Sequence, residues 1–193
     1  MARTGMTTLI DTLRGYTDAG TADYTVGTLT YWSDDEIQRA LDRRRTDNYR
    51  IPIYPQSEYT GGGTIEYKKY YIGVENWEET SGGTAIFTIE DNDGDKIGTA
   101  NWSADYTRGF ITFTANQGGT AYYVTGSNYD LNGAAADIWN SKAAHYARAV
   151  NFSTDNHSIS RGDLIKNALT MSNYYRNQSG MRVIQVYRED CVP

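Results

Sequence analysis

The stretch WSDDEI, residues Trp32–Ile37, carries the clearest helix start in this sequence. Ser33 is placed to cap the backbone amide of Glu36, and the Glu36 carboxylate is placed to reach back to Ser33, which together make a capping box. Trp32 and Ile37 occupy the two positions of a hydrophobic staple. The apolar stripe of the helix consists of Ile37, Ala40 and Leu41. Because a helix with such a stripe is stable only when the stripe is covered, the stretch predicts a packed helical unit.

The helical pattern returns after residue 130. Apolar residues then recur at steps of three and four along one continuous face. They are Ala136, Trp139, Ala143, Tyr146 and Val150. A further helix is expected to begin at Ser160, with Asp163 in the capping-box place, and to stop at Gly180. A shorter N-terminal helix is predicted by three apolar residues ahead of Gly15, namely Leu9, Ile10 and Leu13.

Residues 51–129 have a different character, without a helical period. Twelve of the 19 glycines lie between Gly61 and Gly126, mostly in turn-like clusters. Short runs rich in tyrosine, threonine, isoleucine and phenylalanine separate the clusters. The runs are Ile65–Val74, Ala85–Glu90, Phe110–Thr114 and Ala121–Thr125. Strand-forming runs bounded by glycine turns predict an antiparallel meander.

The predicted fold class is therefore α+β. Residues 1–50 and 130–180 form a small α-helical bundle, which is interrupted by an inserted antiparallel β domain at residues 51–129. Residues 181–193 follow as an extended C-terminal arm. The N-terminal and C-terminal helices are expected to pack together, so that the insertion leaves and re-enters the bundle at neighbouring points.

Composition excludes several classes of protein. The 193 residues carry a net charge of -6, and residues 51–129 hold ten acidic against four basic side chains. This acidic balance argues against a protein that grips nucleic-acid phosphates. No apolar run reaches the roughly 18 residues that a membrane-spanning helix needs, and the N-terminal residues do not resemble a secretory signal. Cys191 is the only cysteine, which excludes an internal disulfide and a cysteine-built zinc site.

The sequence contains no evident catalytic set, so we predict that the protein is not an enzyme and has no catalytic, metal or cofactor-binding residues. Asp155 and His157 share one loop and would make a metal pair or an acid–base couple. Because no third ligand is apparent, a polar connection between two helices is the favoured interpretation, and a hydrolase using this pair is the less favoured one.

Asp91–Asp95 begins like a calcium-binding EF-hand loop. Lys96 stands where that loop needs glycine, and Trp102 stands where it needs a bidentate glutamate. A hairpin turn with Asp-Gly at its tip is predicted instead, and a weak cation site of another kind stays an alternative.

Three other features have structural explanations. Gly61–Gly63 is not followed by Gly-Lys-Ser/Thr, so it is not a phosphate-binding loop. Arg43–Arg45 could touch DNA, but Asp42 and Asp47 flank it, and a solvated helix end or an ion pair between subunits is expected. The tyrosines of the insertion are expected to pack in the sheet rather than to stack on sugars or bases.

The C-terminal arm is the candidate partner-binding segment. It follows a helix stop and is rich in apolar, strand-forming residues, which would be sticky if left free. Either it packs on its own bundle, or it adds to the surface of a partner as a strand. The candidate partner-binding residues are Met181, Arg182, Val183, Ile184, Val186 and Tyr187.

Several of these segments resemble one family. Ser33–Leu41 resembles the opening helix of the head–tail adaptor (connector, or neck) proteins of tailed bacteriophages, and so does Ala134–Tyr146. Asn151–Asp155 followed by Ser160–Leu164 and the Tyr174-Tyr175 pair looks like the last helix of that family. A further resemblance, to a hairpin that recurs in phage structural proteins, lies in Asp105–Phe113. The resemblance covers the helical half of the chain, and the β insertion is larger than in the smallest adaptors.

The resemblance implies a structural virion protein, located in the neck at the head–tail interface and assembled in the host cytoplasm. It implies an oligomeric ring, commonly a dodecamer, between the portal protein and another neck or tail protein. DNA would pass through the lumen without sequence-specific binding, and no membrane would be involved. In such rings the C-terminal arm often docks on the portal. The alternative is a glycan-binding or capsid-decoration module that uses the tyrosine-rich insertion.

Overall fold

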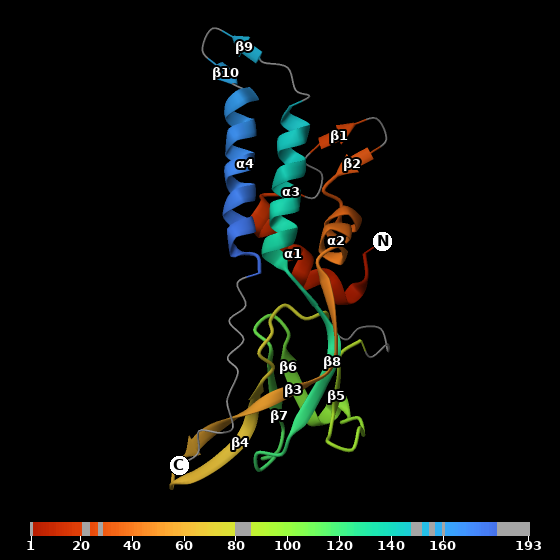
Figure 1. Cartoon of the computed structure of the whole chain (residues 1–193), viewed down its shortest axis with the longest axis vertical. Coiled ribbons are helices and arrows are strands. Elements are labelled where there is room, and N and C mark those ends of the chain that lie inside the picture. Colours follow the sequence, from red (N-terminus) through yellow and green to blue (C-terminus); the bar gives the residue numbers. More distant parts are fainter. Residues whose placement is uncertain are drawn as a thin grey trace.

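The computed structural model describes residues 2–20, 24–26, 29–79, 86–147, 152–154, 157–159 and 161–180. The fold is α+β, as predicted. Four helices gather at one end of an elongated molecule, and a six-stranded antiparallel sheet forms the other end (Figure 1). The two parts meet where the chain passes from helix α2 to strand β3 and from strand β8 to helix α3.

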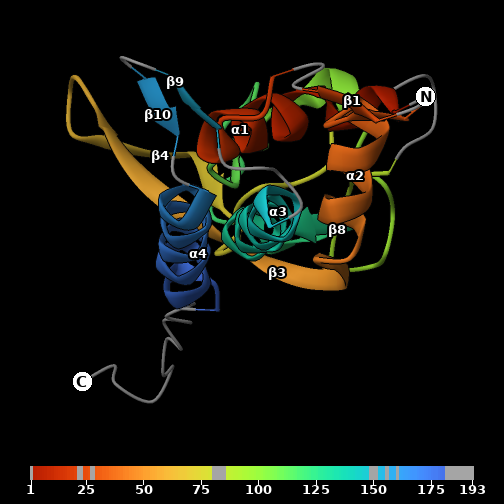
Figure 2. The same cartoon turned by 90° about the horizontal axis from the view of Figure 1, so that it is seen from above.

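The helical part is arranged around α3 (Leu131–Tyr146). This helix contacts the three other helices, α1 (Thr7–Thr17), α2 (Asp34–Asp42) and α4 (Arg161–Gln178). Figure 2 shows α3 between α4 and α2, with α1 beside it. A single 3-10 turn, Thr4–Met6, precedes α1. Buried alanines on α3 let the neighbouring helices approach closely.

Two of the predicted capping signals are confirmed, and the predicted cap at Ser160 lies outside the described residues. The Glu36 carboxylate accepts a hydrogen bond from the Ser33 backbone amide at 3.2 Å, which confirms the capping box. Gly180 follows α4 with φ +83°, as expected of a glycine stop. The predicted N-terminal helix extends past Gly15 to Thr17 and ends at Asp18, which adopts the left-handed conformation.

Two short antiparallel hairpins were not predicted. Strand β1 (Tyr24–Val26) pairs with β2 (Leu29–Tyr31), and β9 (Phe152–Thr154) pairs with β10 (His157–Ile159). The second hairpin connects α3 to α4, where the sequence predicted a polar loop.

The large sheet contains six strands in the order β5-β8-β3-β4-β7-β6. They are β3 (Arg45–Thr60), β4 (Thr64–Tyr71), β5 (Thr88–Glu90), β6 (Trp102–Asp105), β7 (Phe110–Phe113) and β8 (Tyr122–Tyr129). All pairings are antiparallel, but the predicted meander is wrong, because β8 returns to pair with β3 and β5 instead of β7. The insertion thereby enters and leaves the helical part on paired strands, with Arg45 opposite Tyr129.

Strand β3 shows why part of this sheet was not predicted from the sequence. It begins at Arg45, six residues before the expected start of the insertion, and it contains Pro52 and Pro55. Its first half pairs with β8 and its second half with β4, so no residue of β3 has a registered partner on both sides. Each proline therefore has one free strand edge, where its missing amide hydrogen costs little.

Each part has its own hydrophobic core. One cluster contains the apolar stripes of α1, α2 and α3, and Tyr129 from the end of β8. The other cluster lies within the sheet and the loops that cover it, with Trp77, Tyr70 and Ile89 almost fully buried. Because Tyr129 belongs to the helical cluster while its strand belongs to the sheet, the end of β8 joins the two parts.

Candidate functional site

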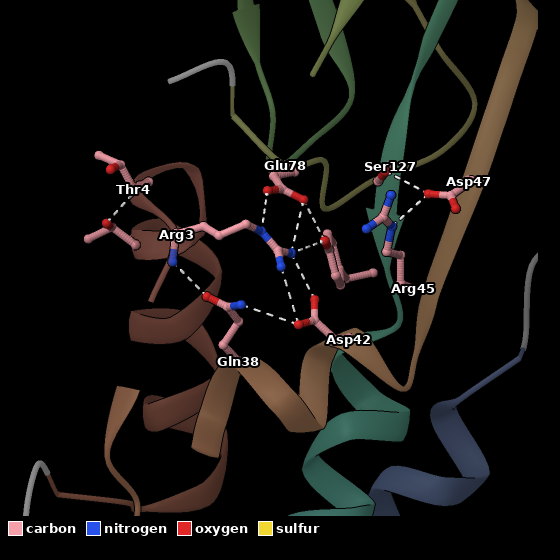
Figure 3. A network of polar contacts seen from close by, with 10 residues as sticks. Arg3, Thr4, Gln38, Asp42, Arg45, Asp47, Glu78 and Ser127 are labelled. Carbon is pink, nitrogen blue, oxygen red and sulfur yellow. Dashed lines mark hydrogen bonds and ion pairs between the residues drawn. The ribbon is translucent and has the colours of Figure 1, made fainter. Parts of the chain in front are cut away.

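A polar joint connects the helical part to the sheet (Figure 3). The Arg3 guanidinium donates hydrogen bonds to Asp42 at 2.8 Å, at the end of α2, and to Glu78 at 3.0 Å, in the loop beside β8. The Tyr129 hydroxyl donates to the other oxygen of Glu78 at 2.5 Å. Gln38 accepts a hydrogen bond from the Arg3 backbone amide at 2.7 Å.

The polar joint contains a buried carboxylate, that of Glu78, whose negative charge is compensated by hydrogen-bond donors. The side chain of Glu78 is 2% exposed, and its carboxylate has both a cation and a hydroxyl as donors. The hydrogen bond to Asp42, more than that to Glu78, raises the pKa of Arg3. Burial, followed by the hydrogen bond to Glu78, raises the pKa of Tyr129. The joint ties the N-terminal segment and α2 to the loop at Glu78 and to the end of β8.

The run Arg43–Arg45 is divided among three environments. Arg44 forms a two-pronged ion pair with Asp137 on α3, with distances of 2.9 and 2.8 Å. Arg45 pairs with Asp47 at 2.6 Å, and hydrogen bonds from Ser127 and then from Arg45 hold the pKa of Asp47 below its usual range. These pairs lie within one chain, whereas the sequence predicted a solvated helix end or pairing between subunits. Arg43 is exposed.

A groove lies between α2 and α3, with a volume of about 200 Å³. We call it the α2–α3 groove. It is lined by Tyr31, Trp32, Glu36, Arg39, Ala40, Arg43, Asp137, Ile138 and Ser141. Trp32 has a φ of +63°, a left-handed conformation that is costly for a bulky residue. Its buried indole Nε1–H has no hydrogen-bond partner within the described chain.

The β3–β4 hairpin extends away from the rest of the sheet, as Figure 1 shows. Gly61–Gly63 makes its turn, with Gly62 and Gly63 at positive φ. Near the tip, Tyr59 stands opposite Ile65 and is 77% exposed. Large exposed apolar side chains at such a projecting tip are typical of a contact surface.

Helix α4 is a second exposed surface. Its buried side faces α3, where the Ser172 hydroxyl donates a hydrogen bond to the Ala136 carbonyl at 2.9 Å. Tyr175 stacks on Tyr16 of α1 with ring centres 5.6 Å apart. On other sides of the helix, Leu169 and Tyr174 are 42% and 54% exposed. The helix therefore presents apolar side chains that the described part of the chain leaves uncovered.

The tyrosines of the insertion are divided between packing and exposure. Tyr70, Tyr122 and Tyr129 are buried, and the rings of Tyr70 and Tyr122 contact each other and Phe113 edge-on or tilted. Tyr54 and Tyr59 are exposed on β3. Packing is thus the role of the most buried tyrosines, and the exposed pair is what a glycan-binding function would have to use.

The segment Asp91–Asp95 is a turn, as predicted. Oδ1 of Asp91 accepts hydrogen bonds from the backbone amides of Asp93 and Asp95 at 3.0 and 2.9 Å. The Arg50 guanidinium donates to the carbonyls of Asp91 and Asn92, both at 3.2 Å. The Arg50 guanidinium thus already binds two backbone carbonyls of this turn.

The other candidates for chemistry are only partly visible. Asp155 lies outside the described residues, and the backbone of His157 belongs to β10. Among the residues that the structure describes, no group of three or more His, Cys, Asp or Glu side chains is placed to hold a metal ion. His145 lines a cavity of about 510 Å³ with Trp139 and Lys142, and the Lys142 ammonium donates to the carbonyls of Thr17 and Asp18 at the end of α1.

The predicted partner-binding residues Met181, Arg182, Val183, Ile184, Val186 and Tyr187 lie outside the described residues. Within the described ranges, no helix is both long enough and apolar enough to cross a membrane.

The sequence matches no protein-family model, and no curated protein is detectably similar to it.

The α2–α3 groove and the polar joint were missed from the sequence. One sequence signal pointed to the groove: Arg39 and Arg43 are four positions apart, so they lie on the same face of the predicted helix. The joint had no local signal, since Arg3 and Tyr129 are 126 positions apart.

Proposed function

We propose that this protein is a structural component of the neck of a tailed bacteriophage. In this proposal it forms a ring between the portal protein and the next neck or tail component, and DNA passes through the centre of the ring. The single observation that carries the proposal is the pair of uncovered apolar surfaces, one on α4 and one at the tip of the β3–β4 hairpin. A ring subunit of the neck needs several contact surfaces, because each copy meets a neighbour on either side and further components along the axis.

The arrangement of the chain supports the same proposal. The helices that carry the resemblance to adaptor proteins, α2 and α3, pack against each other, and the β part is an excursion between them. The polar joint keeps the sheet in a fixed orientation to the helices, as a component that transmits contacts along a virion axis requires. In addition, Arg44 and Arg45 are neutralised by Asp137 and Asp47, which suits a lumen through which DNA slides without sticking.

Native mass spectrometry and negative-stain imaging of the full chain, alone and with the portal protein of the same phage, test the proposal. We expect rings or a ring on the portal. A chain that stays monomeric at high concentration and ignores the portal would overturn it. Removal of residues 181–193 is expected to weaken portal association while the helical circular dichroism is retained.

The second candidate function is recognition of a host glycan, or decoration of the capsid, through Tyr54 and Tyr59. The exposure of both side chains on one strand is the observation in its favour. Saturable binding of a sugar to the full chain, lost on Tyr59→Ala with the fold intact, would favour this function over the ring. In a ring subunit we expect no saturable sugar binding.

A further inference from the structure

The α2–α3 groove presents hydrogen-bond donors and positive charge that the described residues do not neutralise. The guanidinium groups of Arg39 and Arg43 have no ion-pair or hydrogen-bond partner among the described residues. The acids in the same groove are already engaged, since Asp137 pairs with Arg44 and Glu36 caps α2. The groove is therefore suited to an acidic ligand.

The groove also has an apolar wall. Trp32, Ala40 and Ile138 line it and are themselves less than 10% exposed, so the wall consists of packed side chains that are held in place. A ligand that combines an apolar or aromatic group with a carboxylate matches these features.

The tip of the β3–β4 hairpin carries that combination. Glu58 is exposed and stands directly opposite Glu66 in the strand register, and like charges in this position repel each other. Lys68 neutralises Glu66 at 2.7 Å, which leaves Glu58 without an ion-pair partner in the described chain. Tyr59 follows Glu58 directly and is 77% exposed. Because successive side chains of a strand point to opposite faces, the tip has a carboxylate on one face and an aromatic ring on the other.

The hairpin tip and α2 lie on opposite sides of the molecule in both views (Figures 1 and 2). One copy therefore cannot place its own hairpin in its own groove. A contact between the hairpin of one copy and the groove of the next is head-to-tail, and such contacts generate a closed ring when the rotation between copies is right.

We propose that the β3–β4 hairpin of one copy docks in the α2–α3 groove of a second copy of this chain. The hairpin enters edge-on, so that Tyr59 on one face meets Trp32 and Ile138 while Glu58 on the other face pairs with Arg39 and Arg43. This inference rests on the proposed function, because it supplies the contact between neighbouring subunits of the ring.

Charge reversal tests the contact with two variants of the full chain. Glu58→Lys reverses the hairpin, and the double variant Arg39→Glu/Arg43→Glu reverses the groove. Each alone is expected to weaken self-association by about tenfold or more, as measured by sedimentation velocity and native mass spectrometry. An equimolar mixture of the two is expected to restore assembly, because each hairpin then meets a groove of opposite charge. Asp11→Lys, an equal charge change at an exposed site on α1, is the matched control and should assemble normally.

The outcomes separate this contact from the function that it serves. Normal assembly of both reversed variants, or failure of the mixture to restore assembly, overturns the contact. A wild-type chain that never self-associates overturns the contact and the ring together. Restoration in the mixture without any binding to the portal sustains the contact and overturns the neck function. DNA binding by the wild type that is lost on groove reversal, with assembly unchanged, assigns the groove to nucleic acid and overturns the contact.

Discussion

Arg3 and Glu78 lie 75 positions apart in the sequence, yet their side chains form an ion pair at 3.0 Å between the helical part and the sheet. The Glu78 side chain is 2% exposed, so its charge is stable in the fold only while its donors remain. Tyr129 and Arg3 supply those donors, and Asp42 holds the other side of the guanidinium. One buried carboxylate therefore couples the position of the sheet to the end of α2.

Substitutions in this joint are expected to destabilise the fold unequally. Glu78→Gln should lower the free energy of unfolding by about 2–4 kcal/mol, because it leaves the Arg3 charge and the Tyr129 hydroxyl without their carboxylate. Arg3→Met should cost about 1–3 kcal/mol, since Glu78 keeps Tyr129 as a donor and Arg3 is more exposed. Urea unfolding measures both values.

The double variant Arg3→Met/Glu78→Gln should cost less than the sum of the two single variants, because the two residues share one interaction. Arg45→Met is the control, since its partner Asp47 is exposed and the pair should contribute under about 1 kcal/mol. Strict additivity, or an equal effect of Arg45→Met, would contradict the role given to the joint.

Gly109 is expected to be intolerant of any side chain. It has a φ of +69°, and a Cβ atom there would lie 2.0 Å from the carbonyl oxygen of Val74. Gly109→Ala should therefore cost about 3 kcal/mol or more, from backbone strain together with displacement of the Val74 segment. Gly118→Ala is the matched control, because Gly118 has a φ of +60° in open space and should cost about 1–2 kcal/mol. Equal losses in thermal unfolding would show that the contact with Val74 does not matter.

Local signals in the sequence predicted the parts of the fold that depend on neighbouring residues. The capping box at Ser33 and Glu36, the glycine stop at Gly180 and the turn at Asp91–Asp95 each involve groups within a few positions of one another. Helix α1, by contrast, continues past Gly15 to Thr17, and its C-terminus receives support from a distant residue. The ammonium of Lys142 binds the carbonyls of Thr17 and Asp18, which a local pattern cannot reveal.

Features that depend on distant pairing were not predictable in the same way. Strand β3 contains two prolines and lacks the alternation of a half-buried strand, and only its split pairing with β8 and β4 makes it a strand. The strand order was missed because β8 returns to β3, from which it is separated by more than 60 residues. The α2–α3 groove likewise required the packing of two helices that the whole β part separates in sequence.

Alkaline pH is expected to destabilise the fold through buried tyrosines. Burial, with a smaller effect of Tyr122, raises the pKa of Tyr70 to about 12, whereas an unfolded tyrosine titrates near about 10. Between these values the unfolded chain releases the proton and the folded chain keeps it, so stability is full below about pH 10 and falls as pH rises. The fall should be at most about 1.4 kcal/mol per pH unit for Tyr70, and the raised pKa of Tyr129 acts in the same direction.

Urea unfolding of the wild type and of Tyr70→Phe at several pH values measures this effect. The variant should be less stable at neutral pH by about 1 kcal/mol, since the hydroxyl donates to the Thr120 carbonyl at 3.0 Å. Its stability should nevertheless decline less steeply above about pH 10. Parallel curves for the two proteins would place the alkaline sensitivity elsewhere.

Lys142 is expected to hold the C-terminal end of α1 against α3. Its ammonium donates to the carbonyls of Thr17 and Asp18 at 2.9 and 2.8 Å, and the residue is 6% exposed. Two charge-assisted hydrogen bonds to helix-end carbonyls combine a cap with a favourable interaction with the helix dipole. Lys142→Met should keep the aliphatic stem packed but lose both hydrogen bonds. We expect a loss of about 2 kcal/mol in the free energy of unfolding, with faster amide exchange confined to the last turn of α1.

The control is Lys166→Met, at an exposed position on α4, which should change stability by less than about 0.5 kcal/mol. An equal loss of stability in both variants, or unchanged amide exchange at the end of α1, would contradict this role of Lys142. The left-handed conformation of Asp18 would then be enough to end the helix.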